Sequence, residues 1–128
     1  MEVLTTNGIT IGVQSFFQQK HSNAKENRFI HSYQVTISNE KGTSVQLLDR
    51  HWYIVNGAGA IREVSGEGVI GKQPVLAPGE NHKYISWSPI STYIGKMYGF
   101  YTFKDLDSGE KFLVSIPEFK LISPSALN

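Results

Sequence analysis

Hydrophobic and polar residues alternate along most of this chain with a period of two. The clearest example is the segment 29–37, where Phe29, Tyr33, Val35 and Ile37 share one parity and the residues between the last three are polar. This spacing is typical of a β-strand with one buried face, whereas an α-helix places hydrophobic residues three or four positions apart. No window of about a dozen residues shows the helical pattern, so the sequence predicts very little α-helix.

Seven segments carry the strand pattern or are rich in β-branched and aromatic residues. They cover residues 9–17, 29–37, 45–55, 61–64, 82–87, 95–103 and 112–116. Residues 45–55 have bulky side chains at both parities, which indicates a central strand covered on both sides. Gly, Pro, Asn and Asp residues that favour turns separate the segments. About seven strands in a chain of this length predict an all-β sandwich or a small barrel.

The chain has 128 residues, of which 40% are hydrophobic, and this fits one compact domain. We therefore expect a single domain over residues 1–128, with frayed ends at about residues 1–8 and 123–128. The sequence has no cysteine, no secretory leader and no apolar run near the roughly 18 residues of a membrane helix. We expect a soluble protein with no membrane insertion, and the lack of cysteine is compatible with a cytoplasmic location.

The charge balance argues against a dedicated nucleic-acid-binding protein. The chain has 12 Lys and Arg residues and 11 Asp and Glu residues, for a formal net charge of +1, and neither half carries a basic or acidic tail. Proteins that bind nucleic acid use clustered Lys and Arg residues to neutralise phosphates. We therefore expect no nucleic-acid partner.

The segment Gly66-Glu67-Gly68-Val69-Ile70-Gly71 has the Gly-x-Gly-x-x-Gly form of a dinucleotide-binding loop. In that fold a helix follows the glycines and holds the pyrophosphate at its N-terminus. Here Pro74 and Pro78 exclude a regular helix, so a glycine-rich loop between strands is the simpler interpretation. In the alternative interpretation, backbone N–H groups of the loop bind an anion, with added charge from Arg50 or Lys72.

Arg50 and His51 interrupt an otherwise hydrophobic strand beside Trp52. Because an unpaired buried charge costs several kcal/mol, we expect Arg50 to pair with a carboxylate such as Glu63 or Glu67, or with an anionic ligand. The four histidines lack the short spacings of zinc sites, and a metal site gathered from distant strands is the alternative. His31 and His51 are interpreted as packed, hydrogen-bonded rings. The sequence contains no nucleophile elbow, P-loop or metalloprotease motif, so we expect no catalytic residues and no metal ligands.

Several ordered segments resemble the ApaG family of small bacterial proteins. They are Arg50-His51-Trp52 and residues 33–39, 63–71, 73–80, 95–101 and 112–119. The resemblance covers about residues 9–124 and implies an immunoglobulin-like or fibronectin type III-like β-sandwich. It also implies a protein-recognition role, because the family is similar to a domain of some F-box proteins and of a DNA-polymerase-interacting protein.

The resemblance does not imply a specific reaction. The family is named for its genetic neighbourhood with a diadenosine tetraphosphate hydrolase and is linked to cobalt resistance and magnesium efflux. Asn56 stands where the family commonly has Asp, which weakens a metal role for this position. Trp87 stands where small residues are common, which enlarges an apolar surface.

From these observations we predict a non-catalytic binding module with a protein partner and no cofactor; a homodimer is compatible with this prediction. The alternative is a nucleotide- or pyrophosphate-binding module in which Mg²⁺ enters only with a phosphate ligand. Its candidate ligand-binding residues are Arg50, Gly66, Glu67, Gly68, Gly71 and Lys72.

Overall fold

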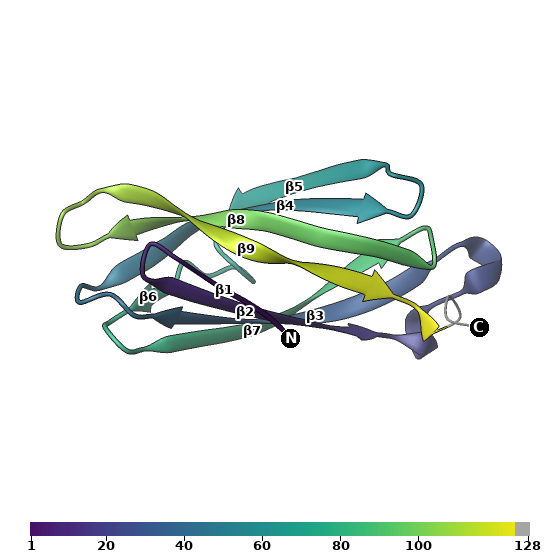
Figure 1. Ribbon diagram of the computed structural model, residues 1–128, viewed down its shortest axis with the longest axis horizontal. Coiled ribbons are helices and arrows are strands. Elements are labelled where there is room, and N and C mark those ends of the chain that lie inside the picture. Colours follow the sequence, from purple (N-terminus) through teal and green to yellow (C-terminus); the bar gives the residue numbers. More distant parts are fainter. Residues whose placement is uncertain (125–128) are drawn as a thin grey trace.

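The computed structural model describes residues 1–124, which form two β-sheets packed face to face (Figure 1). Two short 3₁₀ helices, η1 (Gln19–His21) and η2 (Ala24–Glu26), lie between the second and third strands. The strands are β1 (Glu2–Thr6), β2 (Ile9–Phe17), β3 (Phe29–Asn39), β4 (Val45–Asn56), β5 (Ile61–Glu67), β6 (Val75–Leu76), β7 (Asn81–Ile90), β8 (Ile94–Asp105) and β9 (Lys111–Ile122). The predicted all-β fold is confirmed.

The strand order is β1-β2-β3-β7 in the lower sheet of Figure 1 and β5-β4-β8-β9 in the upper sheet, with β6 paired to β4. Seven strands remain when β1 and β6 are left out: the first, second and fifth share one sheet, and the third, fourth, sixth and seventh share the other. This is the arrangement of immunoglobulin-like and fibronectin type III-like sandwiches. The sandwich prediction is therefore confirmed, and a small barrel is not formed.

The N-terminal residues are not frayed, contrary to the prediction for residues 1–8. Residues 2–6 pair with β2 through an antiparallel hairpin that runs from Glu2 opposite Val13 to Thr6 opposite Ile9. The turn is Asn7-Gly8, with φ values of 50° and 78°, and positive φ at both central residues is what a tight hairpin turn requires. The Asn-Gly pair was the overlooked sequence signal for this strand.

At the C-terminus, the predicted frayed end 123–128 is wrong at its first residue. Ser123 is buried, and its backbone N–H donates a hydrogen bond of 2.9 Å to the carbonyl oxygen of Tyr93. Residues 125–128 lie outside the described residues, so the rest of this prediction stays untested.

Strand β4 is central, as predicted, but only one of its faces is covered. Val45 and Leu47 are buried before a β-bulge, and Trp52 and Ile54 are buried after it. A bulge inserts one extra residue and so moves the following side chains to the opposite face. Hydrophobic residues therefore occur at both parities in this segment because the bulge changes which parity faces the core. Only one face of the strand is buried.

Trp52 is 2% exposed and lies between the two sheets. Its ring contacts those of Tyr33, Tyr101 and Phe119, with centroid distances of 5.2, 6.4 and 5.9 Å. Tyr101 is fully buried. These residues come from β3, β4, β8 and β9, so the aromatic contacts join both sheets.

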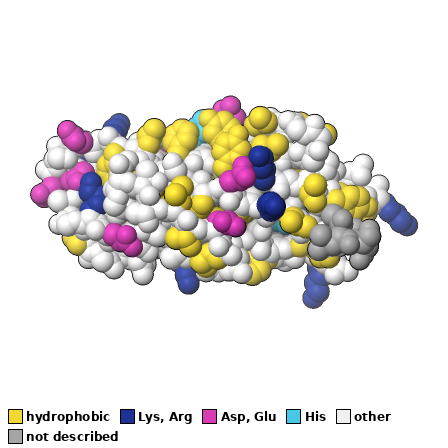
Figure 2. Space-filling model, in the orientation of Figure 1, with side chains coloured by type: hydrophobic (Ala, Val, Ile, Leu, Met, Phe, Trp, Pro, Cys, Tyr) yellow, Lys and Arg dark blue, Asp and Glu magenta, His cyan; other side chains and the backbone are white. Residues whose placement is uncertain are grey.

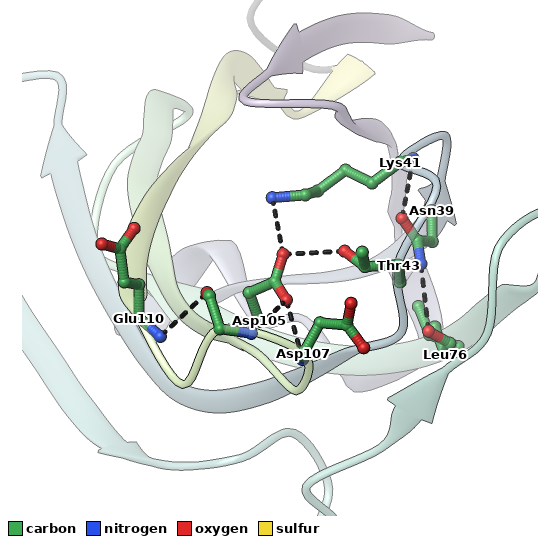
Figure 3. A network of polar contacts seen from close by, with 8 residues as sticks. Asn39, Lys41, Thr43, Leu76, Asp105, Asp107 and Glu110 are labelled. Atoms are coloured by element: carbon green, nitrogen blue, oxygen red, sulfur yellow. Dashed lines mark hydrogen bonds and ion pairs between the residues drawn. The ribbon is translucent and has the colours of Figure 1, made fainter.

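A network of polar contacts around Asp105 ties the β8–β9 turn to the chain between β3 and β4 (Figure 3). The Asp105 carboxylate accepts a hydrogen bond of 2.7 Å from Thr43 Oγ1, and Lys41 Nζ lies 3.1 Å away. The backbone N–H groups of Asp107 and Ser108 also donate to it. The hydrogen bonds, that from Thr43 above all, hold the pKa of Asp105 far below its usual value.

Among residues 1–124, no helix has the length and hydrophobicity needed to cross a membrane.

Candidate functional site

The two sides of the sandwich differ. On one side, β9 packs against β1 and β2. On the opposite side β5 and β7 are the edge strands, and a series of cavities lies between the sheets there. We call this feature the β5–β7 groove.

Arg50 points from β4 into the β5–β7 groove. Its Nη1 atom donates hydrogen bonds to the carbonyl oxygens of Glu67 and Gly68, at 2.9 and 3.0 Å. Among the described residues it forms no ion pair with a carboxylate, so the expected pairing with Glu63 or Glu67 is wrong. Arg50 lies opposite Gly66 in β5, and strand alternation therefore turns the side chains of residues 63 and 67 to the outer face.

Gly66 leaves room for the Arg50 guanidinium. A Cβ atom at this position would lie 2.9 Å from Nη2 and 3.1 Å from Cζ of Arg50. Gly66 and Arg50 both belong to the predicted ligand-binding set, and the structure brings them together. The contact between them is a van der Waals contact and does not involve the Gly66 backbone N–H as a ligand donor.

The rest of the glycine loop is a tight turn whose backbone N–H groups are largely occupied. The N–H of Gly68 donates to the carbonyl of Leu48 at 2.7 Å, and those of Val69 and Lys72 donate to each other's carbonyls at 2.8 and 3.0 Å. Gly68 and Gly71 have φ values of 61° and 71°, which favour glycine. The loop therefore directs carbonyl oxygens, rather than these three N–H groups, toward Arg50.

The side chains of the remaining two predicted residues lie away from Arg50. Glu67 is exposed on the outer face of β5, and Lys72 is exposed in the loop. Burial, and to a smaller extent the charge of Lys72, lowers the pKa of His82 in β7. Lys72 therefore adds positive charge at the loop end of the groove.

Two neighbouring cavities, each of about 160 Å³, form the middle of the groove. Both are lined by Tyr33, Arg50, Trp52 and Ser86. The first cavity is also lined by residues of the glycine loop. The second is also lined by residues of β4, β5, β7 and β8: Ile54, Arg62, Val64, Trp87, Ser88 and Met97. No Asp or Glu lines either cavity.

Arg62 was not identified from the sequence. It lies on β5 opposite Ile54 and points inward, and its Nη2 donates a hydrogen bond of 3.3 Å to the carbonyl of Pro89. Within the described residues, it too has no carboxylate partner. The sequence did contain a signal for its inward orientation: Arg62 is two residues from the hydrophobic Val64, and residues two apart on a strand share a face.

The tyrosines of the groove stay neutral at physiological pH. Burial raises the pKa of Tyr33, and a hydrogen bond with Ser86 and the charge of Arg50 offset part of this rise. Tyr84 and Tyr101 share a hydrogen bond between their hydroxyls, and burial raises the pKa of both. The charge inside the two central cavities is therefore that of Arg50 and Arg62, whereas the third cavity of the groove is also lined by Glu26 and Arg28.

His31 and His51 pack as rings, as expected, but Nε2 of each has no hydrogen-bond partner among residues 1–124, so the expectation of hydrogen-bonded rings is not met at this atom. His31 is buried against Phe17, and His51 stacks on Phe100 with a centroid distance of 4.8 Å and an interplanar angle of 6°. Hydrophobic side chains gather over the β5-β4-β8-β9 sheet, along the upper edge of Figure 2. On the outer face of β4, His51 also contacts the ring of Tyr53. Its Nε2 lies 3.3 Å from Glu63 Oε2. No group of three potential metal ligands occurs among residues 1–124.

A model of the ApaG domain family matches residues 19–105 of the chain. Protein ApaG of Methylobacterium radiotolerans is 47% identical over 119 residues, which cover 93% of this chain and 91% of the relative. The chain belongs to the ApaG family. Protein ApaG of Mesorhizobium japonicum is 44% identical over the same length and with the same coverage.

Solved structures agree with this membership. The crystal structure of a protein from Bordetella pertussis described as a putative ApaA protein has a TM-score of 0.87 and 37% identity, and the match covers 91% of this chain and 94% of that one. A structural-genomics target solved by X-ray has a TM-score of 0.86 and 33% identity, over 92% of this chain and 89% of that one. The resemblance to the ApaG family is confirmed, and no specific biochemical function comes with it.

Proposed function

We propose that this ApaG-family protein is a non-catalytic binding module that recognises a protein partner through the outer face of the β1-β2-β3-β7 sheet. The observation that carries the proposal is the composition of this face. Lys83 is the only charged residue among the outward-facing strand positions, all of which lie within the described residues. These positions are Val3, Thr5, Thr10, Gly12, Gln14, Phe16, Ile30, Ser32, Gln34, Thr36, Ser38, Asn81, Lys83, Ile85, Trp87 and Pro89.

The large hydrophobic side chains of this face lie close together. Phe16 and Trp87 flank Ser32 on the neighbouring strands and are 44% and 51% exposed. Ile85, two residues from Trp87 on β7, is 56% exposed. His21 of η1 packs edge-on against Trp87 at a centroid distance of 5.3 Å, which extends the surface beyond the sheet.

The outer face of the other sheet has a different character. It carries charged residues on each of its four long strands: Asp49, Glu63, Glu67, Lys96, Lys104, Lys111, Glu118 and Lys120. Natural sheets commonly use such charges to keep an outer face in water and to prevent association. The cores of protein–protein interfaces are depleted of charge, which matches the β1-β2-β3-β7 face instead. Aromatic content does not distinguish the two faces, because Tyr53, Tyr98 and Phe100 lie on the outer face of the other sheet.

The resemblance to recognition domains, described above, supports a protein as the partner. The proposal places the module in the cytoplasm, in keeping with the absence of cysteine. It also assigns the family's link to cobalt resistance and magnesium efflux to the partner, because this chain offers a binding face and no group of metal ligands among residues 1–124.

The proposal is tested by comparing partner capture by three proteins in the native lysate. The wild type and a Leu113→Lys control, which changes a 54% exposed residue on the outer face of β9, should retain the same protein. Trp87→Lys should lose it. Urea denaturation checks that the variants are folded. Equal capture by all three proteins, or none that depends on Trp87, would contradict the proposal, and capture of a second copy of this chain would show a homodimer instead.

A further inference from the structure

We propose that the β5–β7 groove binds a phosphoryl dianion between the guanidinium groups of Arg50 and Arg62. This site goes beyond the proposed function, since it lies between the sheets rather than on the outer face. It also differs from the glycine-loop hypothesis, because its donors are side chains and not the backbone N–H groups of residues 66–71.

The first argument is the charge of the two arginines. Both point into the same cavity, and neither forms an ion pair with a carboxylate among residues 1–124. Arg50 uses Nη1 and Arg62 uses Nη2 for backbone carbonyls, so each guanidinium keeps further N–H donors. Arginine forms strong, often bidentate hydrogen bonds with phosphate oxygens, and two arginines match the charge of a dianion.

The second argument is the lining of the cavity. It contains the hydroxyl residues Tyr33, Ser86 and Ser88 and no Asp or Glu that would repel an anion. Ser88 is only 2% exposed, and its Oγ has no hydrogen-bond partner within residues 1–124. A buried hydroxyl without a partner is unfavourable, and rotation about χ1 lets a serine hydroxyl turn toward a ligand.

The third argument is size. Each of the two cavities measures about 160 Å³, whereas pockets that enclose drug-sized ligands measure roughly 300–1,000 Å³. Since about 10–15 Å³ of such space is enough for one water molecule, either cavity has room for a small oxyanion. A phosphoryl group could be inorganic phosphate or the end of a phosphorylated side chain of a partner.

The glycine opposite Arg50 fits this arrangement. Any side chain at position 66 would press against the guanidinium, at 2.9 Å from Nη2 in the case of a single Cβ atom. Gly66 therefore keeps Arg50 in the groove, and in this site it acts as a positioning residue.

The experiment uses Trp52, whose side chain lies between the sheets and lines the groove. Inorganic phosphate is titrated into the ¹⁵N-labelled full chain at constant ionic strength, with chloride as the matched salt, and the indole N–H resonances of Trp52 and of the outward-facing Trp87 are followed by NMR. We expect a saturable shift of the Trp52 resonance with phosphate and none with chloride, and the Trp87 resonance serves as the reference.

Variants decide whether the arginines form the site. Arg62→Gln should weaken phosphate binding about tenfold or more, since it removes charge-assisted hydrogen bonds while its side chain is exposed and contacts only one carbonyl. Gly66→Ala should also weaken binding, by displacing Arg50. Lys120→Gln removes the same charge from β9, at the far edge of the sheet that carries Arg50 and Arg62, and should leave binding unchanged. The absence of a Trp52 shift, or equal binding by Arg62→Gln and Lys120→Gln, would overturn the proposal.

A second titration with a phosphoserine peptide distinguishes the two sources of the phosphoryl group. Tighter binding of the peptide than of inorganic phosphate supports a phosphorylated partner, and equal or tighter binding of inorganic phosphate supports the free ion. Both results are independent of partner capture by the outer face, because Trp87→Lys leaves Arg50 and Arg62 in place.

Discussion

His31 on β3 and Ser88 on β7 lie directly opposite each other, and neither Nε2 of the histidine nor Oγ of the serine has a hydrogen-bond partner within residues 1–124. Both side chains are buried, and the His31 ring packs edge-on against Phe17. Burial disfavours the charged imidazolium and lowers the pKa of His31 to about 4. The interior of the sandwich therefore holds a histidine that is neutral in the folded state.

The first prediction is a loss of stability in mild acid that depends on His31. Between pH 6.5 and about 4, the unfolded chain binds a proton at this histidine and the folded chain does not, so the free energy of unfolding falls as the pH falls. The loss should reach about 3 kcal/mol at pH 4, from about 1.4 kcal/mol for each pKa unit. Urea denaturation at a series of pH values measures it.

His31→Leu is the matching variant, because leucine is close to histidine in size and has no proton to bind. Its stability should change less between pH 6.5 and 4 than that of the wild type, while the contribution of His82, whose pKa is also lowered, remains. Parallel stability curves for the wild type and His31→Leu over this interval would contradict the prediction.

The second prediction concerns a different acid range and the Asp105 network. The pKa of this carboxyl is lowered in the folded state, so its contribution to stability is present above pH 3.8 and is lost as the pH falls further. Asp105→Asn should lower the urea midpoint at neutral pH and remove this lower transition, while the loss assigned to His31 persists. A midpoint equal to that of the wild type at pH 7 would show that the network adds nothing.

The third prediction compares the two tryptophans. Trp52 is 2% exposed between the sheets, so Trp52→Ala should reduce the free energy of unfolding by about 3–5 kcal/mol. Trp87 is 51% exposed, so Trp87→Ala should change it by roughly 0.5 kcal/mol or less. Denaturant titrations of both variants test this, and similar losses from the two substitutions would place the core of the sandwich elsewhere.

The fold was largely predictable because strand alternation is a local property. The segment 29–37 shows it without interruption, and this segment is strand β3. Strand β4 was harder, because its β-bulge changes the buried parity and so imitates a strand covered on both faces. Strand β1 carried a clear turn signal at Asn7-Gly8, but its own hydrophobic pattern is too weak to distinguish it from a frayed end.

The groove was predictable only in part, because it depends on which strands become edges. Arg50 was identified from its place beside Trp52, but its contact with the carbonyls of Glu67 and Gly68 depends on the register of β4 against β5. Arg62 and Ser88 meet across two sheets that the sequence does not align. The spacing of residues along one strand cannot reveal a neighbour on the other sheet.

The fourth prediction separates the glycines of the loop. Gly68 and Gly71 both have positive φ, but a Cβ atom at Gly68 would overlap the carbonyl of Lys72, whereas nothing lies near one at Gly71. Gly68→Ala should therefore lower the free energy of unfolding clearly more than Gly71→Ala, for which the cost is that of the left-handed backbone alone, about 1–2 kcal/mol. Thermal or urea unfolding of the pair measures the difference. Equal losses would mean that close packing in the turn is unimportant.

The last prediction is that the protein does not hydrolyse dinucleoside polyphosphates. Hydrolysis needs a general base or a metal-bound water molecule near the phosphorus atom. The two central cavities of the groove are lined by arginines, which stay protonated, by serines without a neighbouring base, and by tyrosines such as Tyr33 whose pKa is raised. A phosphoryl group held there would meet donors and no proton acceptor.

Purified protein incubated with diadenosine tetraphosphate and Mg²⁺ should release mononucleotides no faster than buffer does, as measured by chromatography. Turnover that scales with protein concentration and is lost in Glu63→Gln or His51→Asn would show instead that the outer face of β4 and β5, where His51 and Glu63 lie 3.3 Å apart, is catalytic.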